Sequence, residues 1–168
     1  MSFKEINLTE LNINPFTSIG SDWMLITSGS MENHNTMTAS WGGLGVLWGK
    51  NVAFCFIRPQ RYTLEFVDKE DCFTLSFFNH EQYKSALNFC GSKSGRDFDK
   101  DKETGLVPTA LDGSVAYKQA SLVFVIKKLH RQDIDPSCFI DPSLDSHYKQ
   151  KDYHKMFVGE IVKCYVRD

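Results

Sequence analysis

The chain has 168 residues, of which 42% are hydrophobic and 24% are charged. It is therefore long enough to bury a substantial core, and we expect one domain over residues 1–168. The formal net charge of -2 excludes the broad basic surface that nonspecific nucleic-acid binding requires, so we expect no nucleic-acid partner. Thirteen Phe, six Tyr and three Trp favour a mainly β fold, because aromatic side chains suit pleated, half-buried surfaces.

The five cysteines are widely spaced and contain no C-x-x-C pair, so we expect neither a disulfide framework nor a metal site. Cys55, Cys72 and Cys164 lie in apolar runs, which predicts that the cysteines are buried thiols in a reducing compartment. Residues 1–14 carry charges and lack the apolar core of a signal peptide, and no stretch is apolar enough to span a membrane. We expect a cytoplasmic location and no membrane partner.

Seven segments are rich in β-branched or aromatic residues and have Gly, Asn or Asp nearby, as strands do. In chain order they are Trp23 to Ser28, Thr36 to Trp41, Val52 to Ile57, Cys72 to Phe78, Ser114 to Tyr117, Leu122 to His130 and Phe157 to Val166. Leu111-Asp112-Gly113-Ser114 predicts a hairpin turn, because Gly tolerates the positive φ of tight turns. The glycines at 42, 43 and 45 predict a second sharp reversal.

Two helices interrupt the strands. The clearer one covers Glu81 to Cys90, where apolar residues follow helical spacing and Gly91 is placed to end the helix. The other covers Gln60 to Asp68, with Pro59 in its first turn. Short strands with two or three helices favour a closed or split antiparallel barrel. Asp133 to Pro142 is expected to be a loop.

Hydrogen-bonding and apolar side chains alternate along Asn35 to Trp41. If Met37, Ala39 and Trp41 point inward, the hydroxyl residues share the opposite face. That face consists of Thr36, Thr38 and Ser40. Together with backbone amides, it would form a polar strip suited to a flavin ring. An ordinary amphipathic strand shows the same alternation.

Two further segments have the residue types of an anion site. Arg58-Pro59-Gln60-Arg61-Tyr62-Thr63 places two guanidinium groups before a predicted helix, whose N-terminal amides attract negative charge. Cys90-Gly91-Ser92-Lys93-Ser94-Gly95-Arg96-Asp97 offers glycines, hydroxyls and cations, as a phosphate nest does, although it does not match the P-loop pattern. Surface arginines and a solvated loop after a helix would give the same two patterns.

His154 stands alone just before the last predicted strand, and a lone histidine is usually structural or solvated. The histidines show no H-E-x-x-H spacing and no serine lies in a G-x-S-x-G motif. These absences exclude the metalloprotease and α/β-hydrolase signatures.

Taken in order, the four segments resemble the flavin reductase family of FMN-binding split barrels, in its flavoredoxin-like branch, over Ser21 to Val166. The resemblance implies a Greek-key split β-barrel with two or three short helices, and a homodimer with FMN near its interface. It also implies hydride transfer from NAD(P)H as co-substrate to the flavin. Trp41, Trp48 and Phe56 are the interface candidates.

The same resemblance implies roles for individual residues, with His154 as the catalytic residue beside the reacting face of the flavin. The FMN-binding residues it implies are Asn35, Thr36, Met37, Thr38, Ala39, Ser40, Trp41, Arg58, Arg61, Tyr62, Thr63, Cys90, Ser92, Lys93, Ser94, Gly95 and Arg96. Reductases of two-component monooxygenases tend to carry Gly-Asp before the equivalent histidine, where this chain has Asp152-Tyr153. Many members also continue beyond the last strand, so we expect no C-terminal lid here.

Three functions remain open at this point. The first is an NAD(P)H-dependent flavin reductase that passes electrons to free flavin, ferric iron or another acceptor. The second is an FMN-binding electron carrier or binding module that does not itself oxidise NAD(P)H, which the altered approach to His154 would allow. The third is a small β-barrel without a cofactor. No Rossmann fingerprint is present to distinguish NADH from NADPH.

Overall fold

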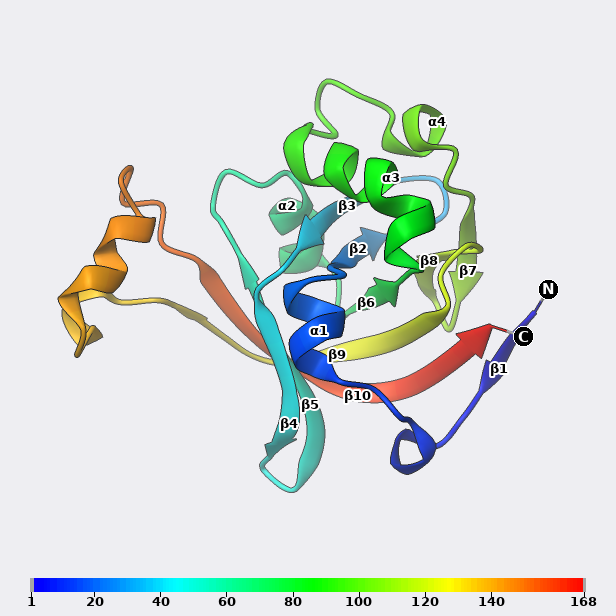
Figure 1. Ribbon diagram of the computed structural model, residues 1–168, viewed down its shortest axis with the longest axis horizontal. Coiled ribbons are helices and arrows are strands. Elements are labelled where there is room, and N and C mark those ends of the chain that lie inside the picture. Colours follow the sequence, from blue (N-terminus) through cyan, green and yellow to red (C-terminus); the bar gives the residue numbers. More distant parts are fainter. Residues whose placement is uncertain (1, 168) are drawn as a thin grey trace.

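The computed structural model describes residues 2–167 and is dominated by one antiparallel sheet (Figure 1). In spatial order its strands are β3 (His34–Ala39), β2 (Met24–Gly29), β6 (Cys72–Phe77), β9 (Leu122–Asp133), β10 (Lys155–Arg167), β5 (Lys50–Ile57) and β4 (Gly42–Leu47), with β1 (Phe3–Glu5) beside β10. The chain passes directly from β3 at one edge to β4 at the other. The sheet therefore curls into a barrel whose edges meet at Ser40 and Trp41.

Short helices and a second hairpin surround the barrel. The α-helices are α1 (Pro15–Gly20), α2 (Thr63–Lys69), α3 (His80–Ser92) and α4 (Lys100–Thr104). The 3-10 helices are η1 (Leu8–Glu10), η2 (Pro136–Cys138) and η3 (Pro142–His147). Strands β7 (Pro108–Leu111) and β8 (Ser114–Tyr117) form the hairpin. Within residues 2–167, no helix has both the length and the apolar character needed to cross a membrane.

The central strands bury both of their faces. In β2, Met24 and Ile26 point into the barrel, whereas Leu25 packs on the outside with Leu87 of α3. In β9, Phe124 lies inside and its neighbours pack outside. Burial on both faces explains why these strands have nearly continuous apolar sequences instead of strict alternation.

The mainly β barrel predicted from the sequence is confirmed, and every predicted strand and helix is present, with shifted ends in all but β8. The predicted hairpin turn is also confirmed, because Asp112 and Gly113 both have positive φ, at 47° and 75°. The short elements β1, β4, β7, α1 and α4 were not predicted. Strand β4 is as long as β3, but its glycines interrupt the run of β-branched and aromatic residues that indicates a strand. The other four elements have too few residues to show a clear period in sequence.

Three local predictions are wrong. The glycines at 42, 43 and 45 do not form a reversal but lie in β4, and the chain turns at Trp48 and Gly49, which have positive φ. Helix α2 begins at Thr63, so Pro59 lies outside it. Gly91 does not end α3 but lies within it, where a Cβ would approach Thr38 Cβ to 3.2 Å, so glycine allows α3 to pack closely on β3.

The cysteines are only partly as predicted. All five are free, and Cys55, Cys90 and Cys164 are buried. The prediction of burial is wrong for Cys72, which is half-buried at the start of β6, and for Cys138, which is exposed.

The connection between β9 and β10, residues 134–154, extends away from the barrel, and we call it the arm (orange in Figure 1). The predicted loop over Asp133 to Pro142 is wrong in part, because Asp133 ends β9 and a 3-10 helix follows at Pro136–Cys138. The arm returns to the barrel at His154, which is buried immediately before β10.

Candidate functional site

Two cavities lie side by side where the barrel closes. The first, the aromatic cavity, has a volume of about 390 Å³ and is lined by Met37, Thr38, Ala39, Ser40, Trp41, Phe56, Arg58, Gln60, Arg61 and His154. The second, the basic cavity, has a volume of about 140 Å³ and is lined by Asn35, Met37, Gln60, Arg61, Tyr62, Thr63, Ser92, Lys93, Ser94, Gly95 and Lys100. They share Met37, Gln60 and Arg61, so together they form one elongated site.

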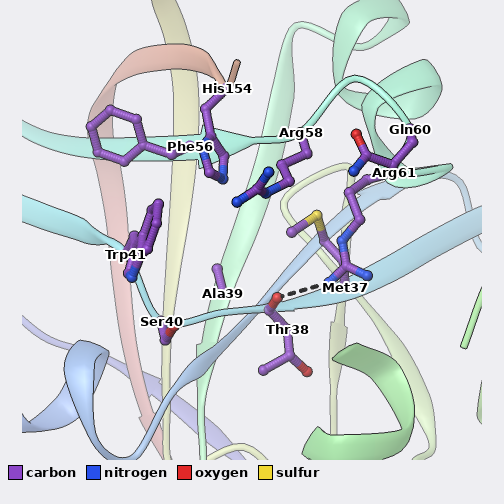
Figure 2. A pocket seen from close by; sticks show the side chains of 10 residues that line it. All are labelled: Met37, Thr38, Ala39, Ser40, Trp41, Phe56, Arg58, Gln60, Arg61 and His154. Atoms are coloured by element: carbon purple, nitrogen blue, oxygen red, sulfur yellow. Dashed lines mark hydrogen bonds between the residues drawn. The ribbon is translucent and has the colours of Figure 1, made fainter. Parts of the chain in front are cut away.

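Strand β3 forms the floor of the aromatic cavity (Figure 2). Its apolar residues Met37 and Ala39 belong to the barrel core, as predicted, whereas the predicted inward position of Trp41 is wrong, because Trp41 follows the end of β3 and is 43% exposed. The predicted hydroxyl strip is wrong for Thr36, which hydrogen-bonds Thr27, and for Thr38, which donates to the carbonyl of Leu87 in α3. At Thr38, the backbone carbonyl faces the site and the side chain points away from it.

Aromatic rings gather around His154 at one end of the site (Figure 2). Its ring centroid lies 5.1 Å from that of Trp41 and 6.3 Å from that of Phe56. Nδ1 lies 2.9 Å from the Tyr148 hydroxyl, whereas Nε2 makes no hydrogen bond within residues 2–167. Burial, with a smaller contribution from Arg58, lowers the His154 pKa to about 4. The imidazole is therefore neutral at physiological pH, and Nε2 is available to a ligand.

Arg58 lies at the aromatic cavity and not at the basic one. Its guanidinium pairs with Asp152 and donates to the carbonyl of His147, so it fastens the arm to the barrel. Gln60 also donates to Asp152, and these two donors, Gln60 first, lower the pKa of that carboxyl. The charge of Arg58 is thus already paired within the protein.

Among residues 2–167, the hydrogen-bond partners of Arg61 and Lys100 are all backbone carbonyls. Arg61 donates to the carbonyls of Gly91 at 2.6 Å and Thr38 at 3.2 Å. Lys100, which is only 7% exposed, donates to the carbonyls of Thr36 and Cys90 at 2.7 and 2.9 Å. Within residues 2–167, no carboxylate forms a salt bridge with either cation.

The basic cavity therefore holds positive charge that the protein does not neutralise. Burial lowers the pKa of Arg61, and it lowers that of Lys100 to about 8. Lys93 adds a third cation, and no Asp or Glu of the described part of the chain lines the cavity. Buried charge is costly unless it is paired. A small anion with several acceptor oxygens, such as a phosphate group, satisfies this donor set.

The structure brings most of the predicted site residues together. Those that line neither cavity are Thr36, Cys90 and Arg96. The pKa of the Cys90 thiol is raised to about 11 by burial, and this residue instead supplies a carbonyl to Lys100. Arg96 pairs with Glu65 and lies over the ring of Tyr62, with its guanidinium carbon 4.5 Å from the centroid.

Sequence reasoning missed Gln60 and Lys100 as individual site residues, and it placed Phe56 at a subunit interface rather than in the cavity wall. Lys100 stands in a run of alternating charges, Asp99-Lys100-Asp101-Lys102-Glu103, which is typical of a solvated face. Only the Asp99 side-chain cap on α4 could have been expected there.

Comparison with known proteins identifies the family. The sequence model of the flavin reductase like domain matches residues 16–168, so the chain belongs to the flavin reductase-like domain family. No protein with a curated description matches the sequence.

Solved structures share the split-barrel fold. An FMN-binding protein from Thermus thermophilus with bound p-hydroxybenzaldehyde has 22% identity and a TM-score of 0.67, covering 87% of this chain and 71% of its own. An FMN-binding domain of a flavin reductases-like enzyme from Shewanella baltica has 15% identity and a TM-score of 0.69, and the match covers 98% of this chain and 77% of that one. Flavoredoxin of Desulfovibrio vulgaris has 20% identity and a TM-score of 0.67, and the match covers 87% of this chain and 69% of that one. The predicted split barrel is thereby confirmed.

The environment of His154 predicts its titration. Because its folded pKa of about 4 lies below the unfolded value of about 6.5, protonation favours the unfolded chain. The stability that neutral His154 contributes is present above about pH 6.5 and is lost as the pH falls from there through about pH 4. NMR titration should show a neutral ring at pH 6, and the urea-unfolded chain provides the reference. A folded-state midpoint at or above the unfolded one would contradict the assigned environment.

Proposed function

We propose that this chain binds FMN, with the phosphate in the basic cavity and the ring system in the aromatic cavity, and that it transfers hydride from NAD(P)H to the flavin. The observation that carries the proposal is a pair of cations, half-buried Arg61 and buried Lys100, whose hydrogen-bond partners within residues 2–167 are all backbone carbonyls. Such a pair stabilises a ligand that brings its own negative charge. FMN combines that charge with a planar ring, and the two adjoining cavities match these two parts.

Bound FMN would supply the hydride-accepting chemistry, which no side chain provides. The protein's own residues would position and shield the reactants. Met37 and Trp41 would contact the ring system, and Arg61, Lys93 and Lys100 would hold the phosphate. Neutral His154 would present Nε2 at the aromatic end, as a hydrogen-bonding group and not as a second positive charge. We propose free flavin, ferric iron or another small acceptor as the destination of the electrons.

A specific contact favours a second candidate, an FMN-binding electron carrier. Asp152 pairs with Arg58 and accepts from Gln60, and this ties the arm down beside the aromatic cavity. A nicotinamide nucleotide approaching His154 would have to pass these contacts of Asp152 with Arg58 and Gln60. If these contacts persist, the arm would keep NAD(P)H away from the flavin, while electrons could still pass between the flavin and another redox partner.

We also propose that the chain forms a homodimer. Large apolar side chains remain exposed on the β4–β5 hairpin and on the neighbouring strand β10, including Val46 at 73%, Trp48 at 59% and Val162 at 40%. The β4–β5 hairpin lies on the side of the barrel away from α3 (Figure 1). A second copy that covers this surface would remove it from water, which is the usual reason for such a patch.

Sedimentation at micromolar concentration should therefore give a species of twice the 19.2 kDa chain mass. Replacing Val46 and Trp48 together by Lys should shift the equilibrium toward monomer, because buried unpaired charge is costly at an apolar interface. As a control, Val107 and Ile140 are replaced together by Lys, because these exposed apolar residues lie outside β4, β5 and β10. A wild-type protein that sediments as a compact monomer contradicts the dimer.

The phosphate assignment predicts that FMN binds more tightly than riboflavin. Arg61→Met should weaken FMN binding by at least about tenfold, because a charge-assisted hydrogen bond contributes about 1.5 to 3 kcal/mol. Riboflavin binding should change little. Arg131→Met is the matched control, since Arg131 pairs with Asp68 and Asp133 on the exposed surface. Fluorescence titration of both flavins against the wild type and the two variants measures the affinities, and equal wild-type affinities for FMN and riboflavin would refute the assignment.

Replacement of His154 separates the two candidate functions. For a reductase, His154→Ala should slow reduction of bound FMN by NAD(P)H by more than about tenfold, equivalent to about 1.4 kcal/mol, with FMN affinity nearly unchanged. His130→Ala is the control, because His130 is exposed on β9 and lines neither cavity. Stopped-flow absorbance measures the single-turnover rate. A wild-type protein that binds FMN but is not reduced by either nucleotide supports the carrier.

A further inference from the structure

Helix α4, which carries Lys100, is attached to the barrel by three hydrogen-bonded side chains that we call the clamp: His34, Asp101 and Tyr117. His34 Nε2 lies 2.9 Å from Asp101 Oδ2, and the Tyr117 hydroxyl donates to Asp101 Oδ1 at 2.8 Å. The His34 side chain is 10% exposed and Tyr117 is fully buried. The clamp thus joins β3, α4 and β8 at a position away from the aromatic cavity.

Hydrogen-bond geometry fixes the protonation state of His34. Nδ1 lies 3.0 Å from the Ser30 carbonyl and Nε2 faces the Asp101 carboxylate, so both ring nitrogens meet acceptors. Only an imidazolium has a proton for each of them. Consistently, the hydrogen bond to Asp101 raises the His34 pKa, although burial opposes this.

The charged and titratable groups around His34 come from three directions. Asp101, Asp99 and Lys100 lie at α4, Tyr117 comes from β8, and Glu32 comes from the turn before β3. Asp101 and then Asp99 favour the charged histidine. Burial and the proximity of Asp101 raise the pKa of Tyr117 well above its usual value, so its hydroxyl stays a neutral donor.

Lys100 is the neighbour of Asp101 in sequence and the single buried residue of α4. A third cavity of about 340 Å³, which contains the clamp residues, shares Asn35, Gly95 and Lys100 with the basic cavity. Lys100 therefore lies between the clamp and the proposed phosphate position. Two of its three N–H donors are used by carbonyls, which leaves one for a ligand.

We propose that His34 is a positioning residue for the phosphate end of the site, because its hydrogen bond to Asp101 holds α4 in place and so keeps the Lys100 ammonium at the basic cavity. This inference rests on the proposed FMN function. A helix of five residues has too few internal hydrogen bonds to be stable alone, so its position depends on such external contacts. His34 touches neither proposed ligand cavity and acts only through α4.

A pH dependence follows from the clamp. Neutral His34 has one proton for two acceptors, so one of its hydrogen bonds is lost as the pH rises through its raised pKa. Above about pH 7, where the phosphate of FMN is already doubly ionised, FMN affinity should then fall with rising pH, whereas riboflavin affinity should not. Lys100, with a pKa of about 8, loses its charge in the same direction. A variant without His34 separates the two groups, because any pH dependence that remains in it comes from Lys100 and not from the clamp.

The test is a double-mutant cycle with His34→Phe and Lys100→Met, in which FMN and riboflavin are titrated at pH values from about 6 to 9. Phe keeps a ring against Tyr117 but removes both donors. At pH 6 we expect His34→Phe to weaken FMN binding by about tenfold and riboflavin binding by less than about twofold. In the Lys100→Met background, His34→Phe should have no further effect on FMN. His80→Phe is the matched control, because His80 packs on Trp23 and lines none of the three cavities.

Each other outcome has a defined meaning. If the wild type prefers FMN to riboflavin but His34→Phe leaves that preference unchanged, the positioning role is wrong and the FMN function stands. The positioning role is also wrong if His34→Phe weakens FMN binding as much in the Lys100→Met background as in the wild type. It is wrong as well if His34→Phe weakens the binding of FMN and of riboflavin by the same factor. If the wild type shows no preference for FMN, the proposed phosphate site itself is wrong, and the inference fails with it.

Discussion

The free edge of strand β3 determines how this site is built. β3 pairs with β2 on one side only, so the carbonyls of Thr36 and Thr38 on its other side need donors that no strand supplies. Lys100 and Arg61 supply them. The backbone of an edge strand thus fixes two cations in place without neutralising them. Their charge stays directed at the basic cavity, which is lined by no acidic side chain of residues 2–167.

The site is electrostatically polarised along its length. At the basic end, cations are held by carbonyls and Gly95 allows its loop to approach β3, where a Cβ would come within 1.9 Å of Asn35 Oδ1. At the other end, rings surround a neutral His154, and Arg58 is paired with Asp152. The cations at the basic end are therefore left unpaired by the protein. At the aromatic end, Arg58 is paired and His154 is uncharged. This gradient suits a ligand with an anionic tail and an uncharged aromatic head.

Sequence reasoning found the parts of this arrangement that depend on local pattern. The long strands, helix α3 and the Asp112-Gly113 turn have periods or φ requirements that the sequence displays. The segments from Asn35, Arg58 and Ser92 do meet at one site, although what each side chain binds there is not a local property. Thr38 turns its hydroxyl to α3 and Arg58 turns to the arm, because partners distant in sequence compete for them. Lys100 was missed for the same reason, since its carbonyl partners are 64 and 10 residues away.

The main-chain anchoring of Arg61 and Lys100 also bears on how the sequence of such a barrel can change over evolution. A salt bridge ties two side chains together, so that replacing either one disturbs the other. A carbonyl is present whatever residue stands at positions 36 and 38, so substitutions there leave the anchor atoms intact as long as β3 keeps its path. The carbonyls that hold the two cations are therefore kept even when the side chains at positions 36 and 38 change. We expect selection to act instead on the two cationic side chains and on the glycines that allow the surrounding chain to come close.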